Sequence, residues 1–400
     1  MSIILLSSLT LSAQDEDTTF VILPDSSNFV TASMIVASPG DAIYSQLGHA
    51  ALHMECPRYR LDYCFSFEEE PGFKGILKFF LGKTDAHMTA VPTPQFLDSF
   101  KNEGRQVKQY TLNLTLHEKQ ELWRLLDNDY VDENMRHFNF LQNNCSSVSL
   151  QSVESVMVDE TLDFNGWPKQ FTENNGAMMR FYTRNSPWLQ FICSTFFGTE
   201  SDISWSQEQR TSPELIPQAI KMAQIVDRNG KKRPLVTGEK ELLPLVNKYE
   251  ASFVSPTLVF GILLLITIII TLSQLKWKLK WLPKALDIFL MSLITIVGLV
   301  LLYTSFVTGL FGIHWNWYLI PFNPFPLIVW LIWRKRKDFY KIYLFYVVIL
   351  VLFILATPLS QQLDLPHHLI TATLAVRCLY HYLVGKREQE SVKKKLNNKK

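Results

Sequence analysis

The sequence predicts an α+β domain outside the cytoplasm, followed by a five-helix transmembrane domain. Three observations predict this arrangement. Up to about residue 250 the composition is that of an ordinary globular protein, whereas long apolar runs separated by basic clusters follow. The basic clusters come after alternate apolar runs, which fixes an orientation in the membrane. A short apolar stretch of the signal-peptide kind opens the chain.

The opening stretch, residues 2–13, is too short to span a bilayer and ends in small residues. It predicts a signal peptide at residues 1–13. The usual Lys or Arg is missing before it, so an uncleaved anchor is the alternative.

The membrane half contains five apolar runs, at residues 253–272, 285–310, 317–333, 342–358 and 368–384. Lysines and arginines follow the first, third and fifth runs, whereas the connections around His314 and Asp364 carry neither. By the positive-inside rule the carboxyl end is cytoplasmic and residues 14–250 are outside. We therefore expect a transmembrane domain at 251–385 and a basic cytoplasmic tail at 386–400.

The third run is short and rich in proline, so we expect it to be kinked or only partly inserted. Several polar residues of the outer connections are expected beneath the soluble domain, where solvation and a part in a headgroup or peptide site are both open. These are His314, Asn316, Asn323, Gln361, Asp364, His367 and His368.

Residues 20–67 read as strands separated by turns. The strands are expected at 20–23, 33–37, 44–54 and 61–67, with turns at 39–41 and 57–60. Within 44–54 the period of two places His49 and His53 on one face. Within 61–67, Asp62, Cys64 and Ser66 share a face. If these two strands pair, an acid or a hydroxyl lies beside the imidazoles.

A cysteine at a predicted helix start is the candidate nucleophile. Asn144 reads as a cap residue, and from Cys145 apolar residues recur at helical spacing. The unpaired N–H groups and the helix dipole there favour a thiolate, which is the attacking species. A buried, inert cysteine is the alternative. Together with His49, Cys145 indicates a catalytic Cys and His pair.

The remaining soluble segments suggest structure more than chemistry. Residues 73–81 mix lysines with large apolar side chains, so they form either a core helix or an element that presses into lipid headgroups. A strand at 106–112 and a helix at 115–128 are expected. Residues 178–197 are aromatic but interrupted by charges and a proline, so they do not span a membrane.

Composition excludes several classes of function. The net charge of +2 is too small to indicate nucleic-acid binding. Five cysteines without a CxxC pair, and without zinc-type Cys and His spacing, argue against a metal. No phosphate-cradling glycine-rich loop is present, so no nucleotide or other cofactor is expected.

Three motifs carry a family resemblance: YSQLGHAALHM, FNFLQNNCSS and SPELIPQAIKMAQIVDRNGKKRPLV. They resemble the soluble domain of Lnb-type bacterial lipoprotein N-acyltransferases. Their order is also similar to the circularly permuted branch of the NlpC and papain-like superfamily, which implies a papain-like fold. By motif, Cys145 matches the nucleophile and His49 the base. The third member is open among Asp62, Ser66 and His53.

The resemblance implies an inner-membrane enzyme with its catalytic domain in the periplasm. Such an enzyme moves an acyl chain from a membrane phospholipid, through a cysteine thioester, to the N-terminal amine of a diacylated lipoprotein. In that scheme Asp62 orients His49, and helix-start amides with Asn144 hold the oxyanion. The residues alone predict only a thiol acyl-transfer or hydrolytic site. A membrane-anchored cysteine peptidase or amidase acting on peptidoglycan peptides is the alternative, and a non-enzymatic binding protein is the third.

Overall fold

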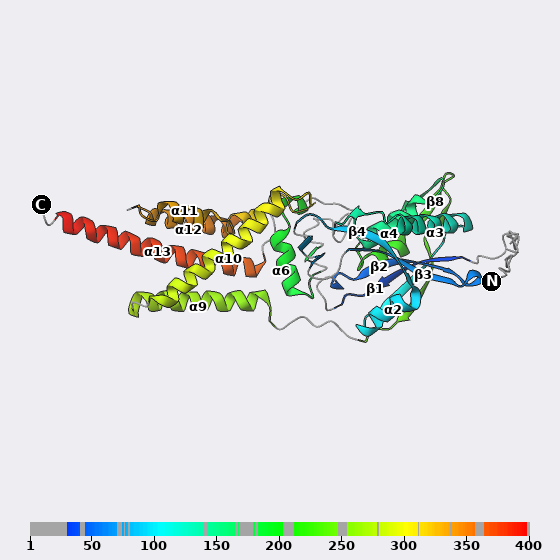
Figure 1. The fold of residues 1–400 in the computed structure, drawn as a ribbon, viewed down its shortest axis with the longest axis horizontal. Coiled ribbons are helices and arrows are strands. Elements are labelled where there is room, and N and C mark those ends of the chain that lie inside the picture. Colours follow the sequence, from blue (N-terminus) through cyan, green and yellow to red (C-terminus); the bar gives the residue numbers. More distant parts are fainter. Residues whose placement is uncertain are drawn as a thin grey trace, which may run out of the picture.

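A computed structural model describes most of the chain. It describes residues 30–40, 45–69, 74–75, 77–78, 81–139, 143–164, 167, 179–180, 183–202, 212–246, 254–277, 280–310, 312–336, 338–356 and 364–397. The predicted signal peptide and the strand expected at 20–23 lie outside the described residues. The molecule is elongated, with a sheet-based part at one end and a helical part at the other (Figure 1).

The sheet-based part is built on seven antiparallel strands in the order β10-β5-β1-β2-β3-β4-β6. Their bounds are β1 Thr31–Ala37, β2 His49–Cys56, β3 Leu61–Glu69, β4 Asp85–Pro92, β5 Val107–Leu112, β6 Arg136–His137 and β10 Val236–Leu243. A second, three-stranded sheet consists of β7 Glu160–Asp163, β8 Gln224–Asp227 and β9 Lys232–Pro234.

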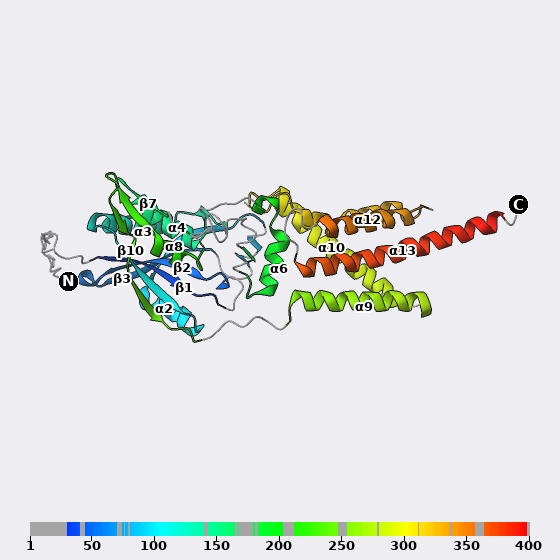
Figure 2. The same cartoon turned by 180° about the vertical axis from the view of Figure 1, so that it is seen from behind.

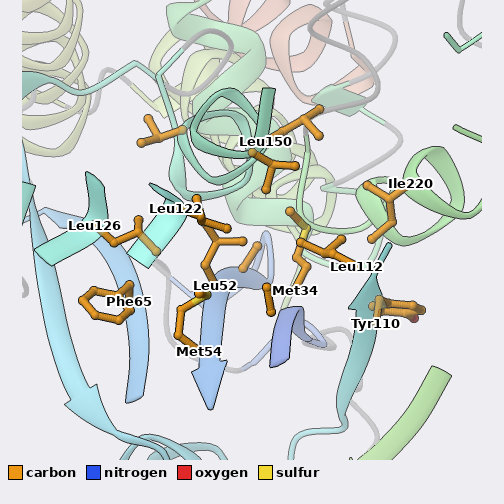
Figure 3. Close-up of a cluster of buried hydrophobic side chains, with 14 of the residues drawn as sticks. Met34, Leu52, Met54, Phe65, Tyr110, Leu112, Leu122, Leu126, Leu150 and Ile220 are labelled. Atoms are coloured by element: carbon orange, nitrogen blue, oxygen red, sulfur yellow. The ribbon is translucent and has the colours of Figure 1, made fainter. Parts of the chain in front are cut away.

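Helices cover both faces of the large sheet. They are α2 Thr93–Asn102, α3 Leu116–Val131, α4 Cys145–Ser155 and α8 Ile216–Met222. The main core joins α3, α4 and α8 to one face, where Leu52 and Met54 of β2 meet Leu122 and Leu126 of α3 (Figure 3). The opposite face packs against α2 through Phe96 and other apolar residues. The side chains of β2 therefore alternate between the two faces as expected, with Leu52 and Met54 facing the main core.

The predicted pairing of the two histidine- and aspartate-bearing strands is confirmed. β2 and β3 form a hairpin whose ladder runs from the Cys56–Leu61 pair to the Leu52–Phe65 pair. The ladder ends there, whereas β3 continues to pair with β4 as far as Glu69. The first residues of β2 and the last residues of β3 therefore face each other across an opening in the sheet. β2 also starts at His49, later than the expected residue 44.

The helical part contains five main helices among the described residues, and each overlaps one predicted apolar run. They are α9 Pro256–Trp277, α10 Trp281–Phe306, α11 Phe325–Trp333, α12 Tyr340–Ala356 and α13 Leu365–Asn397. By length and composition α9 and α10 are able to cross a membrane. The third run is broken, as expected, into a short 3₁₀ helix at Trp317–Leu319 and α11. α13 continues without interruption past residue 385, where the basic tail was expected to begin.

An ionic cluster around the buried Arg377 joins three of these helices. Arg377 of α13 donates through Nε and Nη2 to the two carboxylate oxygens of Asp287 on α10, over 2.7 and 2.8 Å. It also donates to Thr271 and Gln274 of α9. His381 completes the cluster at 2.9 Å from Asp287. Because every member is paired, this cluster fixes the relative positions of α9, α10 and α13.

Candidate active site

Cys145 is the first residue of α4, as the sequence predicts. The side-chain oxygen of Asn144 accepts hydrogen bonds from the backbone N–H groups of Ser146 and Ser147, each over 2.9 Å. The Ser147 hydroxyl accepts in return from the Asn144 N–H over 2.8 Å. This reciprocal cap defines where the helix starts. The cap accepts hydrogen bonds from the N–H groups of Ser146 and Ser147. The Cys145 N–H takes no part in the cap.

The burial of Cys145 opposes the thiolate that a helix start favours. Burial raises its pKa above the ordinary value, and the nearby charge of Glu68 acts in the same direction. Hydrogen bonds from Ala50 and Ser146 lower the pKa, but they do not outweigh the loss of solvation. A helix start favours a thiolate only where the sulfur keeps some contact with water. The residue is 9% exposed.

One partner of the sulfur comes from β2, beyond the end of its ladder with β3. A hydrogen bond from the Ala50 backbone lowers the Cys145 pKa, so its donor is the Ala50 N–H. The ladder between β2 and β3 ends at Leu52, and Ala50 lies two residues beyond that end, toward the amino end of β2. Cys145 therefore lies against the residue that directly follows His49.

His49 is held as a neutral imidazole. Its Nε2 atom lies 2.6 Å from the Ser66 hydroxyl, and its ring packs near Phe96 and Phe100 of α2, with centroids 6.2 and 6.1 Å away. Burial and the positive charge of Arg105 lower its pKa to about 4. A histidine with this pKa is unprotonated at neutral pH, which is the state that accepts a proton.

Glu68 is a member of the site that sequence reasoning missed. Its Oε1 atom lies 3.8 Å from Nε2 of His49, and burial raises the pKa of its carboxyl group. Hydrogen bonds with the side chains of Ser66 and Thr89 oppose that rise, and the Thr89 hydroxyl donates to the Ser66 carbonyl over 3.1 Å. The signal was available, because Glu68 continues the series of alternate residues 62, 64 and 66 along β3 by one step.

Asp62 does not orient His49, so the predicted partner is wrong. Its Oδ1 atom lies 2.7 Å from Nε2 of His53 instead. The strand register explains the difference, because His53 is paired with Cys64, the residue two positions after Asp62. Asp62 and His53 therefore form a separate pair farther along the hairpin.

The Cys145 sulfur contacts the backbone of the residue that follows His49, whereas the His49 ring packs on the α2 side of the sheet against Phe96 and Phe100. No hydrogen bond joins the His49 ring to the Cys145 sulfur in the described part of the chain. The Ala50 nitrogen is covalently bonded to the His49 carbonyl carbon, so the Cα atom of His49 lies within about 6 Å of the sulfur. All five cysteines are among the described residues and are free, so no disulfide blocks Cys145.

Comparison with known families gives two matches. Residues 25–173 match the Lnb N-terminal periplasmic domain, and residues 248–389 match the Lnb transmembrane domain. The chain is an Lnb-type protein. Its mixed α/β part is thus the periplasmic domain of the Lnb family, its helical part is the transmembrane domain, and the family indicates a role in lipoprotein biosynthesis. No curated protein and no solved structure gives a significant match.

Both candidate catalytic residues, Cys145 and His49, lie in the part of this Lnb-type protein that matches the periplasmic domain. Residues 174–247 belong to neither matched segment. Among the residues that the structure describes, no group of three or more His, Cys, Asp or Glu side chains has the arrangement of a metal site.

Proposed function

We propose that this Lnb-type protein is a lipoprotein N-acyltransferase that carries the acyl chain as a thioester on Cys145. The observation that carries the proposal is the meeting of the Cys145 sulfur with the Ala50 N–H, next to a neutral His49. Nucleophilic acyl transfer needs a thiol and a base that can reach it, and the Ala50 contact places the sulfur beside the backbone that carries His49. The family and its transmembrane domain support a substrate drawn from the membrane.

In the first half-reaction the imidazole of His49 takes the thiol proton as the Cys145 sulfur attacks the carbonyl carbon of a phospholipid ester. The carbonyl oxygen becomes an oxyanion, which collapses as the bond to the glycerol oxygen breaks. His49 returns the proton to that oxygen. The products are a lysophospholipid and an acyl-thioester on Cys145.

In the second half-reaction the N-terminal amine of a diacylglyceryl-cysteine lipoprotein attacks the thioester carbonyl. His49 accepts a proton from the amine, the carbon–sulfur bond breaks, and the proton passes to the sulfur. The lipoprotein gains an amide-linked third acyl chain, and the resting thiol is restored. Both steps are proton transfers and acyl transfers, so they balance without a cofactor.

The contacts of Ser66 support Nδ1 of His49 as the base. We assign the single proton of the Ser66 hydroxyl to its hydrogen bond with Glu68. Its oxygen must therefore accept from His49, which places the imidazole proton on Nε2. Nδ1 is then the atom with a free lone pair. A rotation of the His49 side chain that brings Nδ1 to the sulfur completes the pair, within the reach set by the Ala50 contact.

The oxyanion needs donors that the resting structure leaves available. The side-chain oxygen of Asn144 serves the helix cap, so the part of this residue in an oxyanion site stays a prediction. We assign the role to the Cys145 N–H and to the Ala50 N–H, which is released when the sulfur is acylated. His53 lies away from this point with Asp62, so its substrate-side role also stays a prediction.

The proposal places the enzyme in the bacterial inner membrane as a multi-pass protein. Its five helices would span the bilayer, with residues 14–250 in the periplasm and residues 386–400 in the cytoplasm. The basic clusters after alternate helices support this orientation. A papain-like arrangement is supported by the sequence order of His49 and Cys145 and by the position of Cys145 at a helix start.

The test is mass spectrometry of lipoprotein N-terminal peptides from cells in which this protein is the sole N-acylating enzyme. Cys145→Ala and His49→Ala should abolish N-acylation at equal protein abundance. Cys64→Ala, at a buried free cysteine, and His117→Ala, at an exposed histidine, are the matched controls and should retain it. Unchanged N-acylation in both site variants would refute the proposal. Cleavage of peptidoglycan peptides without a trapped acyl-thioester would identify a hydrolase instead.

A further inference from the structure

Helix α6, Pro187–Phe196, lies in the stretch that neither family match covers. Figures 1 and 2 show it between the sheet and the transmembrane domain, running across the ends of the long helices and not along them. Its sequence, PWLQFICSTF, contains no charged residue. A helix that runs across the ends of membrane helices has the placement of a membrane-surface helix.

Hydrogen bonds attach α6 to the outer ends of the transmembrane helices. Ser194 donates to the Asp364 carboxylate over 2.8 Å, and the Thr195 hydroxyl lies 2.9 Å from Nε2 of His367, which is fully buried. Asn316, in the connection after α10, donates to the Thr195 carbonyl over 2.7 Å. Three of the outer polar residues, Asn316, Asp364 and His367, therefore bind α6. The sequence alone leaves open whether these residues are solvated loop residues or part of a binding site.

The amino-terminal half of α6 is attached to α9. The Trp188 indole N–H donates to the Val254 carbonyl over 2.7 Å, just before α9 begins. The Phe191 ring lies 5.1 Å from that of Phe260 on α9. Together with the contacts to Asp364 and His367, these bonds hold α6 at a fixed height relative to α9 and α13.

One stripe of α6 presents large apolar side chains to the outside. Trp188 and Ile192, four residues apart, are 38% and 37% exposed. A second segment at the same level does likewise, because Leu77 and Leu81 are exposed and the Leu81 carbonyl accepts from Tyr303 near the outer end of α10. The side chains expected to insert into lipid from residues 73–81, Phe73, Ile76, Phe79 and Phe80, lie outside the described residues.

We propose that the Trp188–Ile192 stripe of α6 lies in the boundary between headgroups and acyl chains of the outer leaflet, in contact with phospholipid. Lipid is the occupant because Trp188 is hydrogen-bonded just before α9, a helix of the matched transmembrane domain that is long and apolar enough to cross a membrane. Tryptophan is enriched at that depth, where its ring is apolar and its N–H is hydrogen-bonded. The assignment does not depend on the acyl-transfer reaction.

The inner side of α6 packs in the same cluster as the loop that leads to His49. Cys193 and Phe197 pack in a small cluster with Leu47, Met179 and Leu215. Leu47 is two residues before His49 and is followed by Gly48, whose φ of +84° and close approach to the Ala37 carbonyl exclude a side chain. The loop that presents His49 is therefore packed on a helix seated at the membrane surface, which fixes the height of the site above the lipid.

The experiment uses the full-length protein in its native membrane, with photoreactive benzoylphenylalanine in place of Ile192 or, separately, Trp188. After irradiation, peptides from α6 are analysed for phospholipid adducts. Val131, exposed at the end of α3, is the negative control, and Ile296, exposed on α10, is the positive control. We expect adducts at 192 and 188 about tenfold above the Val131 background. Adducts at Ile296 alone, or cross-links from α6 only to protein, would overturn the assignment.

Discussion

Replacing Ser66 by alanine removes the hydroxyl that, in the proposed mechanism, accepts the Nε2 proton of His49. The side chain is fully buried and makes a 2.6 Å hydrogen bond to that nitrogen. Its loss leaves a polar N–H without a partner in a largely buried ring, which costs about 1–3 kcal/mol. If the cost falls on the productive tautomer, thioester formation slows by about 5- to 150-fold. Ser66 is not assigned any substrate contact in the mechanism, so the loss should appear in kcat more than in KM.

The assay is single-turnover acylation of purified full-length protein with a labelled phospholipid, followed by detection of the hydroxylamine-sensitive adduct on Cys145. Ser33→Ala is the matched control, because Ser33 is also fully buried in the same sheet and makes one side-chain hydrogen bond, from Gln109 over 2.9 Å. It faces His53 in the register and not His49. The control should acylate within about twofold of the wild type.

Equal acylation rates for Ser66→Ala and Ser33→Ala, at equal amounts of folded protein, would refute the tautomer argument. A slow Ser66→Ala variant whose unfolding temperature has also fallen far below that of Ser33→Ala would point to a structural role of the hydroxyl. The two readings are separated by measuring both quantities on the same samples.

Three further predictions follow from the site and the transmembrane domain. Glu68→Gln should move the acid limb of the pH profile of thioester formation to lower pH. The wild-type limb follows the Glu68 carboxyl, whose pKa is raised above 4.5, whereas the variant is limited by His49 with a pKa of about 4. An unshifted acid limb would count against the series of contacts from Glu68 through Ser66 to His49. Asn144→Ala should lower the unfolding free energy by about 1 kcal/mol through loss of the helix cap, while Asn144→Asp retains most of it in thermal unfolding. Asp287→Leu should destabilise the transmembrane domain by about 3 kcal/mol, because Arg377 stays buried without its carboxylate. In detergent-stability assays, the double variant Asp287→Leu with Arg377→Leu should recover part of that loss.

Local features of the site could be predicted from the sequence. The start of α4 depends on Asn144 and the residues that follow it, and that cap operates over three residues. The β2 and β3 hairpin depends on two alternating segments joined by a short turn, and it formed as expected. These predictions held because each depends on neighbours in the chain.

The partners of the acidic residues depend on register, which alternation alone does not fix. Pairing Leu52 with Phe65 places His53 beside Asp62, and the opening beyond that pair leaves His49 to Ser66 and Glu68. A different register gives different partners. Likewise the contacts of Asn316, Asp364 and His367 join segments more than a hundred residues apart, so no local pattern distinguished solvated loop residues from junction residues.

The protonation state of Cys145 shows how tertiary packing changes the chemistry that a motif suggests. A helix start lowers a thiol pKa, yet burial against β2 and β3 raises this one, and the same burial lowers the His49 pKa to about 4. Both shifts oppose the formation of a separated thiolate and imidazolium before attack. Proton transfer should accompany attack on the ester, when negative charge moves on to the carbonyl oxygen and its amide donors. A site whose resting partners are both neutral admits an acyl chain without displacing hydrated charges, which suits a nucleophile that receives its substrate from lipid.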